Sequence, residues 1–226
     1  MTTPAMLYDI LLASLGPQNW WPGDTPFEVA VGAVLTQNTA WTNVQKAIEA
    51  LKSRGAMSAQ DILALPPAQL EEIIHPAGFY RVKAGYLRTV SEWISHRAGG
   101  DLPRLAGEET ALLRRELLEL RGIGPETADS ILLYAIGKPV FVVDAYTRRI
   151  GTRLGLVASR ATYEQVQNAF TQGLPADVHT WGEFHALLVR LAKEHCRVRP
   201  ICPDCPLADV CPSFTHPHEN KRRHTT

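Results

Sequence analysis

The chain has 226 residues, and its 23 Lys and Arg balance 23 Asp and Glu, so the formal net charge is zero. This balance argues against a protein that coats nucleic acid through bulk charge, although it is compatible with a local basic face. With 45% hydrophobic residues, no apolar run near the roughly 20 residues that span a bilayer and no signal-peptide pattern at the N-terminus, we expect a cytoplasmic globular protein.

Apolar residues recur at steps of three and four along most of the chain, which predicts amphipathic helices. Strand-like alternation is nearly absent, and Pro and Gly separate the periodic segments, so the joins should be short. Helices are predicted over residues 5–15, 27–36, 42–53, 68–74, 82–96, 109–120, 126–136, 145–155, 161–172 and 182–195. This order predicts an all-α fold, built as a bundle or as two helical lobes.

Two segments near the N-terminus combine aromatic and polar residues. Trp20 and Trp21 precede a proline, and residues 34–41 read V-L-T-Q-N-T-A-W, with Gln37 and Trp41 inside them. On residue type alone, the tryptophans are core aromatics and Gln37 is a surface amide. Further on, residues 78–84 read G-F-Y-R-V-K-A, where Phe79 would most simply be a core residue between helices.

A glycine-rich turn is predicted at residues 120–128, L-R-G-I-G-P-E-T-A. Gly122 and Gly124 permit backbone angles that other residues avoid, and Pro125 suits the first position of a new helix. Free amides at such a helix start can hold a phosphate. The alternative is a plain connector between two helices.

Asp144 follows the apolar run F-V-V and precedes a predicted helix. An aspartate there is a favoured N-cap, because its side chain accepts hydrogen bonds from the first free amides.

All four cysteines fall near the C-terminus, with the spacing C-x5-C-x2-C-x5-C. Disulfides would normally join distant segments, so this clustering favours a metal or cluster site in a reducing compartment. Four thiolates can hold a [4Fe–4S] cluster or a structural Zn²⁺. The candidate ligands are Cys196, Cys202, Cys205 and Cys211.

Together, the glycine-rich turn, the V-D segment and the cysteines resemble the endonuclease III superfamily of helix-hairpin-helix DNA glycosylases, over residues 18–211. The cysteine pattern departs from the family's C-x6-C-x2-C-x5-C by one residue in the first loop. The strings W-W-P, L-T-Q-N-T and G-I-G-P-E-T-A-D resemble the 3-methyladenine-specific branch.

The resemblance implies a role for each candidate residue. Gly122 and Gly124 would bind the DNA backbone, while Phe79 would enter the duplex as a wedge and Gln37 would fill the gap left by the flipped base. Asp144 would be catalytic. The base pocket would contain Trp41, Trp20, Trp21 and Glu126. Stacking on aromatic faces suits a cationic alkylated purine.

The resemblance also implies how the lobes are divided and what they bind. Residues 27–136 would form a six-helix barrel with the hairpin, while residues 1–26 and 137–226 would form a second lobe with a structural iron–sulfur cluster, or alternatively zinc. The base would enter between the lobes. The partner would be double-stranded DNA with a damaged base, bound by a monomer associated with the nucleoid.

Glu126 stands where bifunctional relatives have a lysine nucleophile, and a carboxylate cannot form a Schiff base. This substitution favours a monofunctional glycosylase for alkylated purines that leaves an abasic site. Three alternatives stay open: a glycosylase for oxidised pyrimidines or mismatched bases, a lyase that uses another lysine such as Lys83 or Lys193, and a catalytically silent DNA-binding or redox-sensing scaffold.

Overall fold

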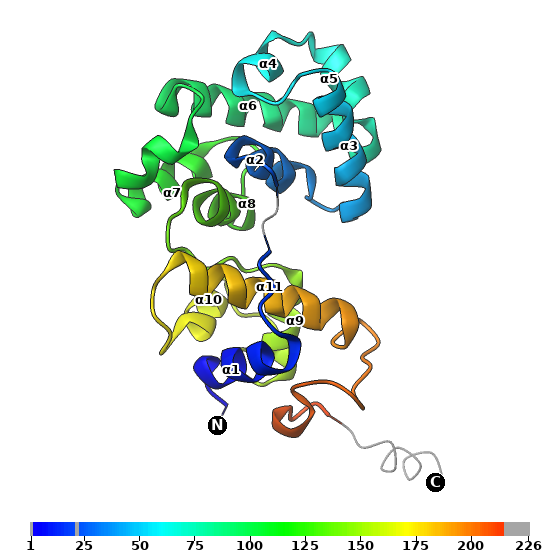
Figure 1. Cartoon of the computed structure of the whole chain (residues 1–226), viewed down its shortest axis with the longest axis vertical. Coiled ribbons are helices and arrows are strands. Elements are labelled where there is room, and N and C mark those ends of the chain that lie inside the picture. The colour runs from blue at the N-terminus through cyan, green and yellow to red at the C-terminus, as the bar shows by residue number, and fades with distance from the viewer. Residues whose placement is uncertain (1, 21–22, 215–226) are drawn as a thin grey trace. The chain divides into compact units, whose positions relative to one another are not determined.

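The computed structural model of the chain describes residues 2–20 and 23–214, and in these residues helices occur without any strand (Figure 1). The predicted all-α fold is therefore confirmed. None of the described helices is long and apolar enough to cross a membrane. The α-helices are α1 (Pro4–Leu15), α2 (Pro26–Leu35), α3 (Trp41–Ser53), α4 (Ala59–Ala64), α5 (Pro67–Ile73), α6 (Tyr80–Ala98), α7 (Thr110–Glu119), α8 (Pro125–Ser130), α9 (Ala145–Arg153), α10 (Tyr163–Thr171) and α11 (Val178–Glu194).

Short helices of other types join them. Residues 126–136, predicted as one helix, divide into α8 and the π-helix η3 (Ile131–Ile136), which ends at Gly137 in the left-handed conformation. The 3-10 turns are η1 (His75–Ala77), η2 (Leu102–Gly107) and η4 (Ala208–Val210). The sequence did not predict α4, because six residues are too few to show a helical repeat.

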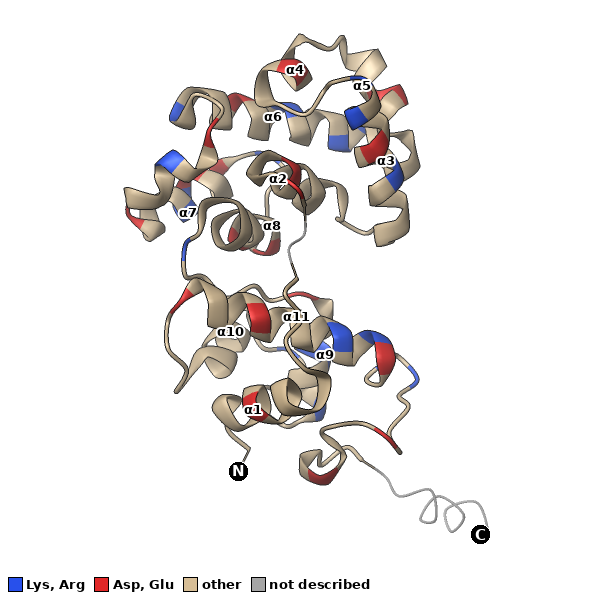
Figure 2. Cartoon of the chain, in the orientation of Figure 1, with Lys and Arg blue, Asp and Glu red and all other residues tan. Residues whose placement is uncertain are grey.

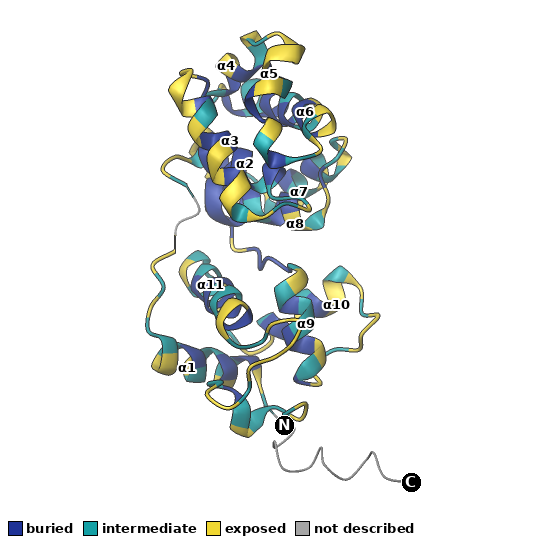
Figure 3. Ribbon diagram, turned by 90° about the vertical axis from the view of Figure 1, so that its right-hand side faces the viewer, coloured by how far each residue is buried: buried dark blue, intermediate teal, exposed yellow. Residues whose placement is uncertain are grey.

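Contacts between Cα atoms divide the chain into two compact units. Unit 1 contains Met1–Trp20 and Phe141–Thr226, and unit 2 contains Trp21–Val140. The sequence placed the corresponding divisions after residues 26 and 136. Each unit has its own apolar core (Figure 3).

The core of unit 2 is organised around α2. Eight of its ten residues are buried, and it contacts α3, α6, α8 and η3. Thr25 caps the helix by accepting a hydrogen bond from the Glu28 amide, and Pro26 begins its first turn. Unit 2 therefore places the start of α3, the start of α6 and the glycine-rich turn on elements packed around one buried helix.

The core of unit 1 contains α1, α9, α10 and α11. Phe141 stacks on Phe170 with ring centroids 5.9 Å apart and lies 5.7 Å from the Phe184 ring. Residues 140–143 are buried and extended but form no ladder with another segment in the described part of the chain. The buried run therefore fixes the position of Asp144 at its end.

Candidate functional site

The glycine-rich turn joins α7 to α8 as predicted, but its two glycines differ. Gly122 has φ of +85°, and a Cβ added there would lie 2.2 Å from the Tyr86 ring, so both its backbone angle and its surroundings require glycine. Gly124 has an ordinary extended conformation, with φ of −93°, and open space around it. The expectation of an unusual backbone angle at Gly124 is therefore wrong. Its exposed position at the N-cap of α8 instead leaves the backbone approachable.

A buried ion pair fixes the two helices of this hairpin. Arg114 on α7 donates to both carboxylate oxygens of Asp129 on α8, over 2.7 and 3.3 Å, and the Asp129 side chain is fully buried. Two parallel bonds of this kind constrain geometry as well as distance. The sequence analysis noted Asp129 only as part of a motif and missed Arg114, because spacing along the chain does not show that the two face each other.

The Gln37 side chain is bonded to the hairpin. Its Nε2 donates to the carbonyl oxygen of Gly122 over 3.0 Å and to Oγ1 of Thr127 over 3.1 Å. Gln37 is partly buried, so the alternative of a solvated surface amide is wrong. The contacts show that Gln37 links the loop after α2 to the turn between α7 and α8.

Phe79 is exposed, contrary to the reading as a core residue. Its exposed fraction is 71%, and it precedes α6 in the left-handed conformation, with φ of +46°. Val82, one turn further on, is 51% exposed. The left-handed backbone at an exposed phenylalanine is the unusual feature here, and such strain is typical of functional segments.

Trp41 and Glu126 are the remaining candidate residues of unit 2. Trp41, at the start of α3, has its ring beside Gly32 of α2, at ordinary van der Waals distance from a Cβ placed on that glycine. It is partly exposed. Glu126 is exposed in the first turn of α8, where a negative charge favours the helix dipole.

The two lysines considered as nucleophiles differ in accessibility. Lys83 is only 2% exposed, and its ammonium donates to three oxygens, while Lys193 is exposed on the last turn of α11. Burial lowers the pKa of Lys83. Its buried and fully bonded amine is poorly placed to attack a sugar.

In unit 1, Asp144 is the N-cap of α9, as the sequence predicted. Its Oδ1 accepts from the Thr147 amide over 2.7 Å and from Thr147 Oγ1 over 2.8 Å. Its Oδ2 faces Nε2 of His185 at 3.6 Å. One oxygen of the carboxylate therefore caps the helix, and the other lies beside a histidine.

Asp144 is nearly buried, with 14% of its side chain exposed. Burial by itself raises the pKa of this carboxyl, but attraction to His185 and the hydrogen bonds from Thr147 outweigh it and hold the pKa below its usual value. The group is thus a carboxylate at neutral pH. His185, itself buried on α11, is a site residue that the sequence analysis missed, because nothing near it in the sequence marks it.

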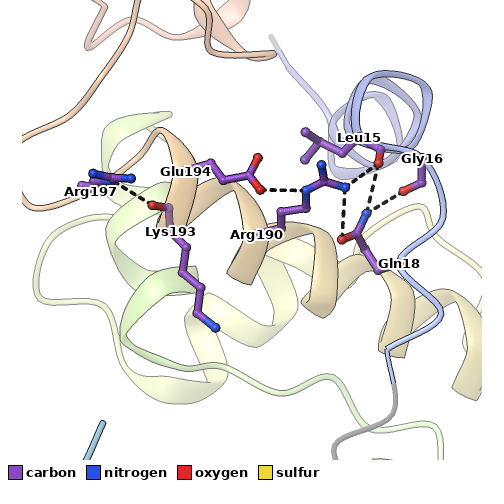
Figure 4. A network of polar contacts seen from close by, with 7 residues as sticks. All are labelled: Leu15, Gly16, Gln18, Arg190, Lys193, Glu194 and Arg197. Carbon is purple, nitrogen blue, oxygen red and sulfur yellow. Dashed lines mark hydrogen bonds and ion pairs between the residues drawn. The ribbon is translucent and has the colours of Figure 1, made fainter. Parts of the chain in front are cut away.

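Trp20 lies beside the same histidine. The Trp20 and His185 rings are 5.7 Å apart, and 39% of the tryptophan is exposed. The preceding segment is tied to α11: Arg190 donates to the carbonyl of Leu15 over 2.7 Å, and Gln18 donates to the carbonyls of Leu15 and Gly16 (Figure 4). The backbone amide of Gln18 also donates to the carboxylate of Glu183. Trp21 lies outside the described residues.

The four cysteines line a single hollow of about 390 Å³, which includes space open to solvent, and none forms a disulfide. Burial and the neighbouring cysteines raise the pKa of Cys202 and of Cys205. In the described residues, no three His, Cys, Asp or Glu side chains converge on one point as ligands of a metal ion.

Arginines of α9 hold the loop that follows the first cysteine. Arg149 donates to the carbonyl of Cys196 over 2.8 Å, and Arg153 donates to Cys196 Sγ over 3.2 Å and to the carbonyls of Arg197 and Val198. Figure 2 shows Lys and Arg on α9 and on the C-terminal part of α11. Two of these basic residues, Arg149 and Arg153, therefore hold the cysteine loop in shape.

The described part of the chain is all-α and has a glycine-rich turn between two helices, an aspartate that caps a later helix and four clustered cysteines. Together these features define a helix-hairpin-helix protein. Residues 31–176 match the HhH-GPD superfamily of base excision DNA repair proteins, and the chain belongs to this family. A protein of Methanocaldococcus jannaschii, named as a candidate DNA repair glycosylase, is 44% identical over 91% of this chain and 94% of its own. Endonuclease III of Thermotoga maritima is 30% identical over 89% of each chain.

Solved structures of relatives share the fold. The Helicobacter pylori 3-methyladenine DNA glycosylase bound to 1,N6-ethenoadenine has a TM-score of 0.76 and 29% identity, covering 85% of this chain and 98% of that one. A trapped covalent intermediate of endonuclease III with DNA has a TM-score of 0.79 and 26% identity, covering 95% of this chain and 98% of that one.

Proposed function

We propose that the protein is a DNA glycosylase that hydrolyses the N-glycosidic bond of a flipped, alkylated purine and has no lyase activity. The observation that carries this proposal is the environment of Asp144: a nearly buried carboxylate, kept ionised, with one oxygen left beside His185 and with Trp20 close to that histidine.

The chemistry needs a negative charge at the sugar. Loss of the base leaves positive charge on the sugar ring, and a fixed carboxylate in a water-poor site stabilises that charge strongly. Because Oδ1 of Asp144 is used by the Thr147 cap, Oδ2 is the oxygen available for the sugar or for guiding water. Nε2 of His185 would hold Oδ2 in place.

The preference for alkylated purines rests on the aromatic residues. A purine alkylated on a ring nitrogen is cationic, so an aromatic π-face such as that of Trp20, beside His185, would attract it beyond stacking. A cationic base is also a good leaving group, so its release needs little help from a general acid. The similarity to a 3-methyladenine DNA glycosylase supports this choice.

The positions of the lysines support the proposal of hydrolysis without lyase activity. Glu126 takes the place of the family's nucleophilic lysine, and the amine of Lys83 is buried and bonded. Lys193 is exposed, and its carbonyl accepts a bond from Arg197, while its amine points away from the polar contacts drawn in Figure 4. Water is then the nucleophile.

Duplex DNA would be gripped mainly by unit 2. The backbone amides at the start of α8 would bind a backbone phosphate, the exposed Phe79 ring suits insertion between base pairs, and Gln37 is bonded to the hairpin turn. The side-chain amide of Gln37 is bonded to the carbonyl of Gly122. Filling the gap would require that bond to be exchanged for one to the unpaired base.

We propose that the cysteine loop holds an iron–sulfur cluster. Four thiols line one hollow, Arg153 already donates to Cys196 Sγ, and the buried Nδ1 of His195 has no hydrogen-bond partner among the described residues. Cys196, Cys202, Cys205 and Cys211 would hold the cluster, which would supply structural cross-linking of this loop near DNA. Metal binding would replace the protons of these partly buried thiols.

The direct test is base release from methylated duplex DNA, with strand breaks scored before and after alkali. We expect free 3-methyladenine, breaks only after alkali, and no release by Asp144→Asn. Asp177→Asn is the matched control, because Asp177 caps α11 in the same unit through a 2.8 Å bond from the Thr180 amide.

A second function is favoured by the endonuclease III relatives, of which the Thermotoga maritima protein is 30% identical. In that case the same assay would detect release of an oxidised pyrimidine base, while methylated purines would stay attached to the DNA. Breaks before alkali, with an enzyme–DNA adduct trapped by borohydride, would show lyase chemistry and contradict the monofunctional assignment.

A further inference from the structure

Lys83 joins three segments of unit 2. Its Nζ lies 2.8 Å from the carbonyl of Leu35, 2.6 Å from Oγ1 of Thr39 and 2.8 Å from the carbonyl of Ala77. An ammonium has three hydrogens to donate, and all three are used. The acceptors come from the end of α2, the loop before α3 and the turn before α6.

Two of these segments contain strained residues. Asn38 has φ of +52° in the loop of residues 36–40, and Phe79 has φ of +46° directly after Gly78, with φ of +64°. Left-handed backbone at ordinary residues persists only where neighbouring contacts impose it. Lys83 bonds both segments, within two residues of each strained position.

Thr39 strengthens the same connection. Its hydroxyl lies 2.5 Å from the carbonyl of Ala77 and accepts from Lys83. The loop of residues 36–40 is also bonded to the hairpin, since Gln37 donates to Gly122 and Thr127. Hydrogen bonds therefore run without a break from the hairpin turn, through this loop and Lys83, to the turn that presents Phe79.

The connection has an electrostatic cost. None of the partners of Lys83 in the described part of the chain is a carboxylate, and a buried charge without a counter-charge is expensive. A methionine would fill the same space without that penalty. The retained charge indicates that fixed geometry, and not core stability, is what Lys83 provides.

We propose that Lys83 is a positioning residue that locks the wedge turn, residues 77–79, to the loop of residues 36–40 and thereby to the hairpin. Unit 2 then presents Phe79, Gln37 and the hairpin amides to the duplex with their spacing already set. Such preorganisation spares the enzyme the entropy of ordering two loops on each encounter. This inference rests on the proposed glycosylase function.

The test compares Lys83→Met with Lys46→Met, a change at an exposed lysine of α3 in the same unit. Base extrusion is followed by the fluorescence of a 2-aminopurine next to the lesion, and base release is measured separately. We expect Lys83→Met to slow extrusion and release from paired duplex by about tenfold or more, because small misplacements of positioned groups are costly. Lys46→Met should match the wild type.

A second substrate separates positioning from instability. When the lesion lies in an unpaired bulge, the base is already unstacked and needs little help from the wedge turn. On this substrate the rates of extrusion and release by Lys83→Met should be within about twofold of the wild-type rates. A loss of folded protein would instead lower the rates on both substrates equally. Equal defects on the two substrates, or no defect on either, would overturn the proposal.

Thr39→Val covers the case in which Lys83→Met does not fold. It removes the hydroxyl acceptor but keeps the shape of the side chain, and we expect the same paired-versus-bulged difference at smaller size. A Thr39→Val protein that extrudes bases like the wild type would contradict the proposal. The extrusion signal does not depend on bond cleavage, so a wild type that extrudes but releases no base would refute the proposed function alone.

Discussion

Nε2 of His185 lies 3.6 Å from Oδ2 of Asp144, although the two residues are on different helices, α11 and the start of α9. At this distance the contact is an ion pair or a long dipolar contact, and not a short hydrogen bond. The histidine therefore acts on the carboxylate mainly through charge and orientation.

Replacing His185 should move the acid limb of the pH–rate profile to higher pH. The pKa of Asp144 is raised by burial and lowered more strongly by His185 and Thr147, so its net position is below the usual value. His185→Phe keeps a ring against Trp20 but removes the attraction, so the carboxyl protonates at higher pH and activity is lost earlier on acidification. The profile of kcat against pH measures the shift.

The control for this change is His179→Phe, at an exposed histidine in the first turn of α11. It should leave the acid limb where it is in the wild type. If both variants give the wild-type profile, the histidine does not tune Asp144, and the 3.6 Å contact is only a matter of packing.

Two substitutions should distinguish the helix-capping role of Asp144 from its catalytic role. Asparagine is as good an N-cap as aspartate, so Asp144→Asn should keep the free energy of unfolding at pH 7 within about 1 kcal/mol of wild type while abolishing base release. Asp144→Ala should abolish release and also lose about 0.5–2 kcal/mol, because the Thr147 amide loses its acceptor. Urea unfolding and base release are the two measurements.

The same carboxyl makes stability depend on pH. A group whose pKa is lower in the folded state stabilises the fold above its unfolded pKa, and this contribution disappears as pH falls through the folded value. The difference in stability between wild type and Asp144→Asn should therefore shrink on acidification below the ordinary aspartate range. A difference that is constant with pH would show that the ionised form is not favoured by folding.

The helices could be predicted from the sequence because their apolar residues repeat over two or more turns, as in α6 and α11. Asp144 and Gly122 could be recognised because local chemistry marks them: an acid before a helix, and a glycine in a turn. His185 and Arg114 could not, since their partners are far away in sequence. The exposure of Phe79 was also hidden, because an isolated aromatic has no pattern that distinguishes core from surface.

Breaking the hairpin ion pair on one side should destabilise unit 2. Arg114→Met leaves the fully buried Asp129 carboxylate without this partner, and the cost should be about 3 kcal/mol at most, because Arg114 itself keeps 24% exposure. Adding Asp129→Leu removes the buried charge and should recover part of the loss. Urea unfolding of the two single variants and the double variant gives the coupling; additive losses would mean that the pair does not stabilise the hairpin.

The two hairpin glycines should respond oppositely to alanine. Gly122→Ala forces a left-handed angle on alanine and places its Cβ 2.2 Å from the Tyr86 ring, so unfolding should become easier by about 2 kcal/mol or more. Gly124→Ala meets no atom within 4 Å and keeps an ordinary angle, so stability should hold or rise slightly. The added methyl should nevertheless weaken binding to undamaged duplex, because it obstructs the close approach of a phosphate to the α8 amides. The measurements are the melting temperature and the affinity for undamaged duplex, made on both variants. A Gly122→Ala protein as stable as the wild type would contradict the role given to Gly122. A Gly124→Ala protein with wild-type affinity would contradict the role given to Gly124.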